Sequence, residues 1–159
     1  MRLTCALTGH RELPARYDIN VLYDALEERI LAGCDRFLCG MARGFDLLAL
    51  SCLMDLRKTY PLTLVACIPY GGQEYAVRGA ERELYRSLRA ACDEEIVLCP
   101  GYRSGCLPAR DRYMADRADV VLAWCVRETG GTAYTVSYAK KKGVDVVFVP
   151  RTFAKEDNF

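Results

Sequence analysis

Short segments that combine glycine with polar residues follow four apolar runs of this chain, at residues 8–11, 40–46, 69–73 and 130–132. Glycine lets a backbone approach a ligand closely, and a helix that starts in such a loop presents free N–H groups to a phosphate. Residues 40–46 and 130–132 both precede predicted helices. The pattern is typical of phosphate binding, although neither segment alone is a nucleotide-binding fingerprint and a plain tight turn is the alternative for each.

Charged side chains in these segments add to the phosphate hypothesis. Arg11 and Arg43 are candidate anion clamps, because a guanidinium offers two parallel donors to a phosphate; ordinary surface arginines are the alternative. Asp46, at the start of a predicted helix, is a candidate for binding ribose hydroxyls, or it complements the helix dipole. His10 is either an acid–base group or a loop residue that makes hydrogen bonds.

Polar residues elsewhere have weaker claims. Gln73 either contacts a base or ribose or caps the following helix. Arg112 and Asp116 are spaced i, i+4 on a predicted helix, so a salt bridge is the simplest interpretation. The three lysines at residues 140–142 are typical of the solvated end of a helix, where cations suit the dipole.

Strands and helices are predicted to alternate along the chain. Buried strands are expected at residues 3–7, 36–39, 62–68, 95–99, 120–126 and 144–149, with helices starting near Asp18 or Asn20 and at about residues 43–58, 78–92, 108–118 and 132–142. This order predicts an α/β fold of three layers, Rossmann-like, with a mostly parallel sheet of about six strands flanked by helices. The four segments then meet at the carboxyl ends of the strands.

Composition limits the classes of protein and partner. We expect one domain over residues 1–150 and a short polar tail over 151–159. The formal net charge of +1 gives no general attraction to nucleic acid, and no segment is long or apolar enough for a signal peptide or membrane span. Nine cysteines without a C-x-x-C pair, beside one histidine, predict no metal site and suit a reducing cytoplasm.

Taken together, the strand-end segments resemble the SLOG superfamily of Rossmann-like proteins, which includes DprA and the LOG phosphoribohydrolases, and in particular its YpsA-like branch, DUF1273. The resemblance rests on residues 8–11, 40–46, 69–73, 112–116 and 130–132 in that order. It implies a pocket for a nucleotide or nucleotide sugar, with these ligand-binding residues: Gly9, Arg11, Gly40, Arg43, Gly44, Asp46, Gly130, Gly131 and Thr132. We add Thr8, Gln73 and Arg112 as further ligand-binding candidates.

LOG enzymes carry a motif of the form P-G-G-x-G-T-x-x-E, whose glutamate serves catalysis. Here the corresponding stretch lacks one glycine element, and Thr135 stands where the glutamate would be. The leading hypothesis is therefore a binding protein, regulatory or sensing, for a nucleotide or an NAD- or ADP-ribose-like compound, with no other cofactor assigned. Such a protein is expected to be cytoplasmic, and a homo-oligomer is compatible with apolar residues on its helices.

Two other functions stay open. A phosphoribohydrolase that cleaves the N-glycosidic bond of nucleoside monophosphates would need a carboxylate, for which Asp46 and Glu128 are the weak candidates. A DNA-processing accessory protein is the third hypothesis, although balanced charge makes nucleic acid an unlikely partner.

Overall fold

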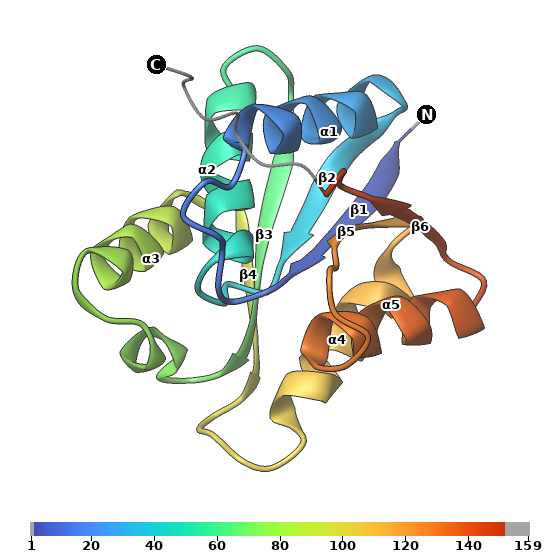
Figure 1. Ribbon diagram of the computed structural model, residues 1–159. Coiled ribbons are helices and arrows are strands. Elements are labelled where there is room, and N and C mark those ends of the chain that lie inside the picture. The colour runs from blue at the N-terminus through green and yellow to red at the C-terminus, as the bar shows by residue number, and fades with distance from the viewer. Residues whose placement is uncertain (1, 152–159) are drawn as a thin grey trace.

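The computed structural model describes residues 2–151. Of the polar tail expected over residues 151–159, only Arg151 lies among the described residues. Strands and helices alternate as expected from the sequence (Figure 1). Their bounds are β1 Leu3–Gly9, α1 Ile19–Leu31, β2 Cys34–Cys39, α2 Phe45–Leu56, β3 Thr63–Tyr70, η1 Gln73–Ala76, α3 Gly79–Ala91, β4 Glu94–Cys99, α4 Cys106–Arg117, β5 Val120–Trp124, α5 Gly131–Lys141 and β6 Asp145–Phe148.

All six strands form one parallel sheet in the order β4-β3-β2-β1-β5-β6. From β1 the chain adds strands on one side as far as β4 and then crosses to the other side for β5 and β6. The order reverses between β1 and β5, and a crevice opens outside the carboxyl ends of the strands at such a point. The sheet is thus wholly parallel, where the sequence predicted a mostly parallel one.

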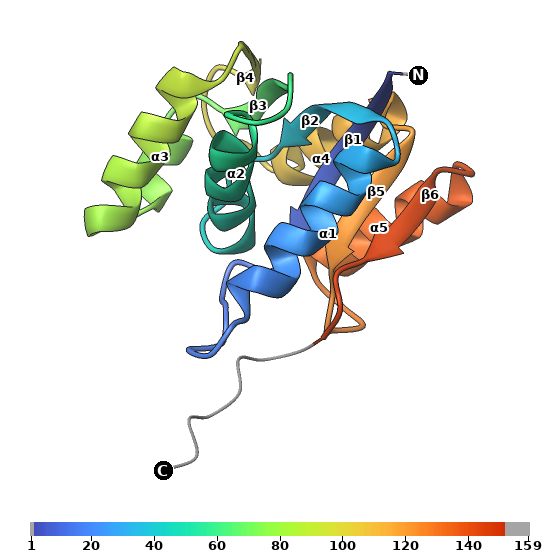
Figure 2. The same cartoon turned by 90° about the horizontal axis from the view of Figure 1, so that it is seen from above.

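Helices cover both faces of the sheet. Figure 2 shows α1, α2 and α3 on one face and α4 and α5 on the other. The larger hydrophobic core lies under the first group, and α2 is its most buried helix, because eight of its residues are buried. A smaller core lies under α4 and α5. This three-layer α/β arrangement confirms the predicted Rossmann-like fold; the single-domain boundary at residue 150 stays a prediction.

Local sequence signals account for several helix ends. Asp18 caps α1, because its Oδ1 accepts hydrogen bonds from the N–H groups of Asn20 and Val21 at 3.0 and 3.4 Å. Gly33, with φ of 112°, follows the end of that helix. The helix α2 begins two residues later than expected, because Gly44 has φ of 78° and cannot belong to it. The short 3₁₀-helix η1 was missed, since residues 73–76 carry no helical apolar period.

The nine cysteines are all free thiols, and all but Cys92 are buried. The buried ones act as small apolar side chains of the strands and helices. Over residues 2–151, no helix is both long and apolar enough to cross a membrane.

Candidate functional site

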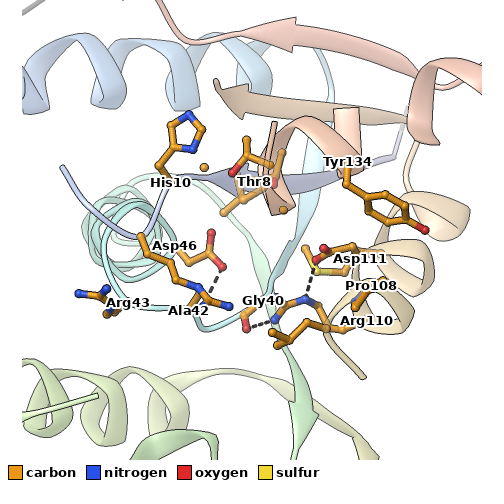
Figure 3. A pocket seen from close by; sticks show the side chains of 18 of the residues that line it. Thr8, His10, Gly40, Ala42, Arg43, Asp46, Pro108, Arg110, Asp111 and Tyr134 are labelled. Atoms are coloured by element: carbon orange, nitrogen blue, oxygen red, sulfur yellow. Dashed lines mark hydrogen bonds and ion pairs between the residues drawn. The ribbon is translucent and has the colours of Figure 1, made fainter. Parts of the chain in front are cut away.

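A cavity of about 650 Å³ lies at the switch point between β1 and β5. Its size falls in the range of small-molecule sites. The loops after β1, β2 and β5, the start of α5 and the helix α4 line it. Figure 3 shows side chains from the first two loops opposite those of α4 and Tyr134 of α5. The lining residues that the sequence predicted are Thr8, Gly9, Arg11, Gly40, Arg43, Asp46, Gly130, Gly131 and Thr132.

The loop between β2 and α2 forms the floor of this cavity. Met41 has φ of 60°, which is uncommon for a residue other than glycine. The turn that follows brings the N–H of Ala42 to Oδ2 of Asp46, at 3.1 Å. A left-handed residue in a loop of this kind stores local strain, and such strain concentrates at ligand sites.

Asp46 is a buried carboxyl group in the cavity wall, only 5% exposed. Burial raises its pKa from 3.8 to about 6, because the charged form loses water. The guanidinium of Arg110, the Ala42 N–H and the guanidinium of Arg11 oppose this rise in pKa, and the nearby Asp111 adds to it. The pKa of this cavity-lining carboxyl group is therefore closer to neutral pH than that of an exposed aspartate.

Arg110 is a functional candidate that the sequence reading missed. It is 5% exposed, donates to the backbone carbonyl of Gly40 and pairs through Nε with Oδ1 of Asp111 at 2.9 Å. Figure 3 shows both side chains beside the cavity. The sequence does indicate that Arg110 is unusual. It lies one helical turn from both Cys106 and Met114, so it places a charge on the buried, apolar face of α4.

The glycines of the site fall into two groups. A Cβ atom on Gly9 would lie 2.1 Å from the Phe45 ring, and one on Gly40 would lie 2.6 Å from the Arg110 guanidinium. On Gly44 it would lie 2.2 Å from the carbonyl oxygen of Arg11. These three glycines are needed for close packing between protein groups, which explains them without a ligand.

Gly130 and Gly131 are different, because a Cβ atom on either would meet nothing within 4 Å. Gly130 has φ of 102° and precedes α5, which starts at Gly131. The buried Thr132 follows in the first turn of that helix and lines the cavity. The N-terminus of α5 is therefore open toward the cavity, with backbone N–H groups free of intrahelical partners.

Thr135, which stands in place of the LOG glutamate, faces inward. Its hydroxyl donates to the carbonyl of Gly131 at 3.0 Å, and the side chain is 3% exposed. The described structure thus places no carboxylate at this position of α5. Glu128, the other weak catalytic candidate, is exposed and lies outside the lining of the cavity.

His10 lines the cavity but is held by the protein. Its Nε2 accepts a hydrogen bond from the N–H of Val126 at 2.9 Å, and its ring lies edge-on to Trp124 at 5.2 Å. Burial lowers its pKa, and the charges of Arg127 and Arg151 lower it further. These contacts favour the second interpretation of His10, a loop residue that makes hydrogen bonds, because its neutral ring connects the loops after β1 and β5.

Three predicted residues do not line the main cavity. The N–H of Gly44 donates to Glu81 at 3.0 Å. Gln73 lines a smaller neighbouring cavity, but its amide donates to Gly40 at 3.1 Å and accepts from the Tyr85 hydroxyl at 2.9 Å, so protein partners hold it. Arg112 donates a hydrogen bond to the hydroxyl of Tyr134, which itself lines the cavity, at 2.9 Å.

The predicted ion pair between Arg112 and Asp116 is wrong. Asp116 instead accepts from the Tyr138 hydroxyl at 2.7 Å. Both residues bind tyrosines of α5, because α4 and α5 pack side by side and offer hydroxyl partners across their interface. The prediction from the i, i+4 spacing considered α4 alone and did not include the hydroxyl groups of the neighbouring α5.

A parallel sheet with an arginine-lined cavity at its switch point defines a Rossmann-like α/β protein of the kind that binds its ligand at the strand ends. Within that class, the chain belongs to the YspA SLOG family, whose family model matches residues 14–147. The resemblance drawn from the strand-end segments is confirmed at this level. No curated protein matches the chain significantly.

Solved structures agree on the fold. DNA processing protein A (DprA) from Streptococcus pneumoniae is similar with a TM-score of 0.70 and 20% identity, covering 94% of this chain and 51% of that one. DprA from Helicobacter pylori, described with a single-stranded DNA binding mode, has a TM-score of 0.67 and 17% identity, over 94% and 66% of the two chains. The structural-genomics target TM1055 has a TM-score of 0.62 and 14% identity, over 96% and 76%.

This chain therefore spans about half the length of the pneumococcal DprA chain and two thirds of the Helicobacter one. At these identities the likeness concerns the fold.

Proposed function

We propose that this protein binds a nucleotide or a nucleotide derivative in the switch-point cavity and acts as a regulatory or sensing module. One observation carries the proposal: the open, glycine-lined start of α5 faces the same cavity as Arg11 and Arg43. Helix N-termini and arginines both favour phosphate groups. Membership of the SLOG family supports the same class of ligand.

Calorimetry on the full chain with AMP, ADP-ribose, NAD and ribose 5-phosphate tests the proposal. We expect at least one of these compounds to bind, and Gly131→Val to weaken that binding at least tenfold, because its side chain would occupy the space beside the α5 N–H groups. Ala80→Val is the matched control, since Ala80 is an exposed first-turn residue of α3 outside the cavity. No binding of any compound by the wild-type protein would refute the proposal.

A phosphoribohydrolase is the second candidate, and one observation favours it. The carboxyl groups of Asp46 and Asp111 both line the cavity, and the pKa of Asp46, raised by burial to about 6, suits proton transfer near neutral pH. Incubation with AMP, followed by chromatography for free adenine, separates enzyme from binding protein. We expect no release of base; release that disappears in Asp46→Asn would establish the enzyme instead.

Nucleic acid is a less favoured partner for this chain. The single-stranded DNA named for the Helicobacter protein belongs to a chain that this one only partly covers. A formal net charge of +1 gives little general attraction to phosphate backbones. We expect no gel shift with single-stranded DNA at physiological salt; a shift that is lost when the lysines at 140–142 are neutralised would favour a DNA-processing role.

We also infer a cytoplasmic location, because nine free cysteines suit a reducing compartment. The homo-oligomer stays a prediction, which light scattering on the purified chain measures.

A further inference from the structure

A second cavity, of about 210 Å³, adjoins the switch-point cavity. The two cavities share Arg11, Ala42, Arg43 and Leu107 in their linings, so they meet along one wall. The side chains that belong to the second cavity alone are mainly apolar or aromatic: Met41, Tyr70, Gln73, Ala76, Val77 and Tyr102. The main cavity, in contrast, gathers most of the charged groups.

Two tyrosines form the aromatic part of the second cavity. Tyr70 ends β3 and Tyr102 lies in the loop after β4, with ring centroids 5.2 Å apart at an interplanar angle of 84°. Tyr102 is 69% exposed as a whole residue. An exposed aromatic face beside a cavity is available to stack on a planar ligand group.

The backbone holds this tyrosine pair in place. The N–H of Gly71 donates to the carbonyl of Cys99 at 2.9 Å. A Cβ atom on Gly71 would lie 2.3 Å from the carbonyl oxygen of Pro100, so the two loops cross at a point where only glycine fits. Tyr102 is therefore placed by the fold, although its side chain is on the surface.

Positive charge lies where the two cavities meet. Arg11 and Arg43 line both of them, and the exposed ion pair between Arg43 and Glu12, at 3.5 Å, is a weak one that a phosphate replaces at low cost. Both arginines thus stand between an aromatic compartment and the open start of α5. This order of groups suits a nucleoside diphosphate sugar, in which a base and its ribose are followed by two phosphates and a second sugar.

We propose that the second cavity is the base subsite of the ligand: the aromatic base lies against Tyr70 and Tyr102, the diphosphate runs past Arg11 and Arg43 toward Gly131, and a second sugar lies in the switch-point cavity. This inference rests on the proposed function and deepens it, because it selects nucleoside diphosphate sugars over mononucleotides.

The dimensions agree with this assignment. A cavity of about 150 Å³ binds benzene in another protein, so a cavity of about 210 Å³ accepts one base. The switch-point cavity, of about 650 Å³, is larger than a phosphate needs and has room for a sugar.

Photoaffinity labelling locates the base directly. The full chain is irradiated with 8-azido-ADP-ribose, digested with trypsin and analysed by mass spectrometry. We expect the label on the peptides that contain Tyr70 or Tyr102, residues 59–78 and 90–103. Label only on residues 128–140, which contain the start of α5, would overturn the proposal, because the base would then lie in the switch-point cavity.

A pair of variants gives the second measurement. Tyr102→Ala should weaken ADP-ribose binding about tenfold or more, since stacking of one base contributes about 1–3 kcal/mol. Ribose 5-phosphate, which has no base, should bind Tyr102→Ala and the wild-type protein equally. Tyr75→Ala is the matched control, because Tyr75 is 65% exposed and lines neither cavity.

The outcomes separate the two proposals. Unchanged ADP-ribose affinity in Tyr102→Ala would overturn the base subsite and leave the proposed function standing. No binding of AMP, ADP-ribose, NAD or ribose 5-phosphate by the wild-type protein would overturn both. Equal loss of affinity in Tyr102→Ala and Tyr75→Ala would also overturn the base subsite, because the effect would not be specific to the cavity.

Discussion

Replacement of Asp46 by asparagine should stabilise this protein at neutral and alkaline pH. Asp46 is buried, and its pKa rises from 3.8 to about 6 in the folded chain. Because the folded-state pKa is the higher one, the folded state favours the protonated carboxyl. The protonated carboxyl group therefore contributes its full share to the free energy of unfolding below pH 3.8. This contribution declines as the pH rises toward about 6 and is lost above it.

The size of the effect follows from the shift in pKa. A shift of about two units, at 1.36 kcal/mol for each, makes the ionised form cost about 3 kcal/mol of folding free energy. Roughly half of this cost accrues between pH 5 and pH 8. Asparagine has no charge to bury, and its amide oxygen can still accept the hydrogen bond from Ala42.

Urea denaturation of both proteins at pH 5, 6, 7 and 8 measures the difference in unfolding free energy. We expect the advantage of Asp46→Asn to grow by about 1.5 kcal/mol across this range. Asp24→Asn, which removes an exposed carboxylate of α1, reports the effect of net charge alone. An Asp46→Asn advantage that does not change with pH would refute the reasoning, because burial would then not have raised the pKa of Asp46.

Further expectations concern packing and ligand. Gly44→Ala should lower the free energy of unfolding by about 3 kcal/mol or more in the same assay. Gly143 has nearly the same φ but open space around it, so Gly143→Ala should cost only about 1 kcal/mol. Equal losses in the two variants would count against the packing argument. Arg110→Met should cost about 3 kcal/mol, because it leaves a largely buried carboxylate unpaired, and a cost below 1 kcal/mol would contradict that pairing. Thr135→Val should leave ribose 5-phosphate affinity within twofold in calorimetry, since its hydroxyl serves only the helix backbone.

Much of the fold was predictable, because buried parallel strands are continuous apolar runs that alternate with helical segments. The helix expected to start near Asp18 or Asn20 begins at Ile19, and Asp18 caps it. The start of α2 was predicted two residues too early, because Gly44 has a positive φ of 78° and lies outside the helix. The pattern of apolar residues along a helix does not reveal the backbone conformation of the loop before it.

The site was predictable in position and less so in detail. Strand-end loops meet wherever a parallel sheet is formed, which brought Arg11, Asp46 and Gly131 to one cavity. A glycine in the sequence does not reveal whether protein atoms or a ligand occupy the space beside it. Nor does the sequence around Gln73 indicate that its side chain binds the Tyr85 hydroxyl and the carbonyl of Gly40. Such contacts depend on segments that are distant in sequence.

The division between crowded and open glycines also bears on how the protein can change. Gly9, Gly40 and Gly44 are surrounded by protein atoms, so most substitutions there disturb folding. Gly131 has free space and no left-handed φ, and a new side chain there would alter the cavity without disturbing packing. The loop between β5 and α5 therefore tolerates a new side chain at Gly131, whereas the loops after β1 and β2 do not tolerate one at Gly9 or Gly44.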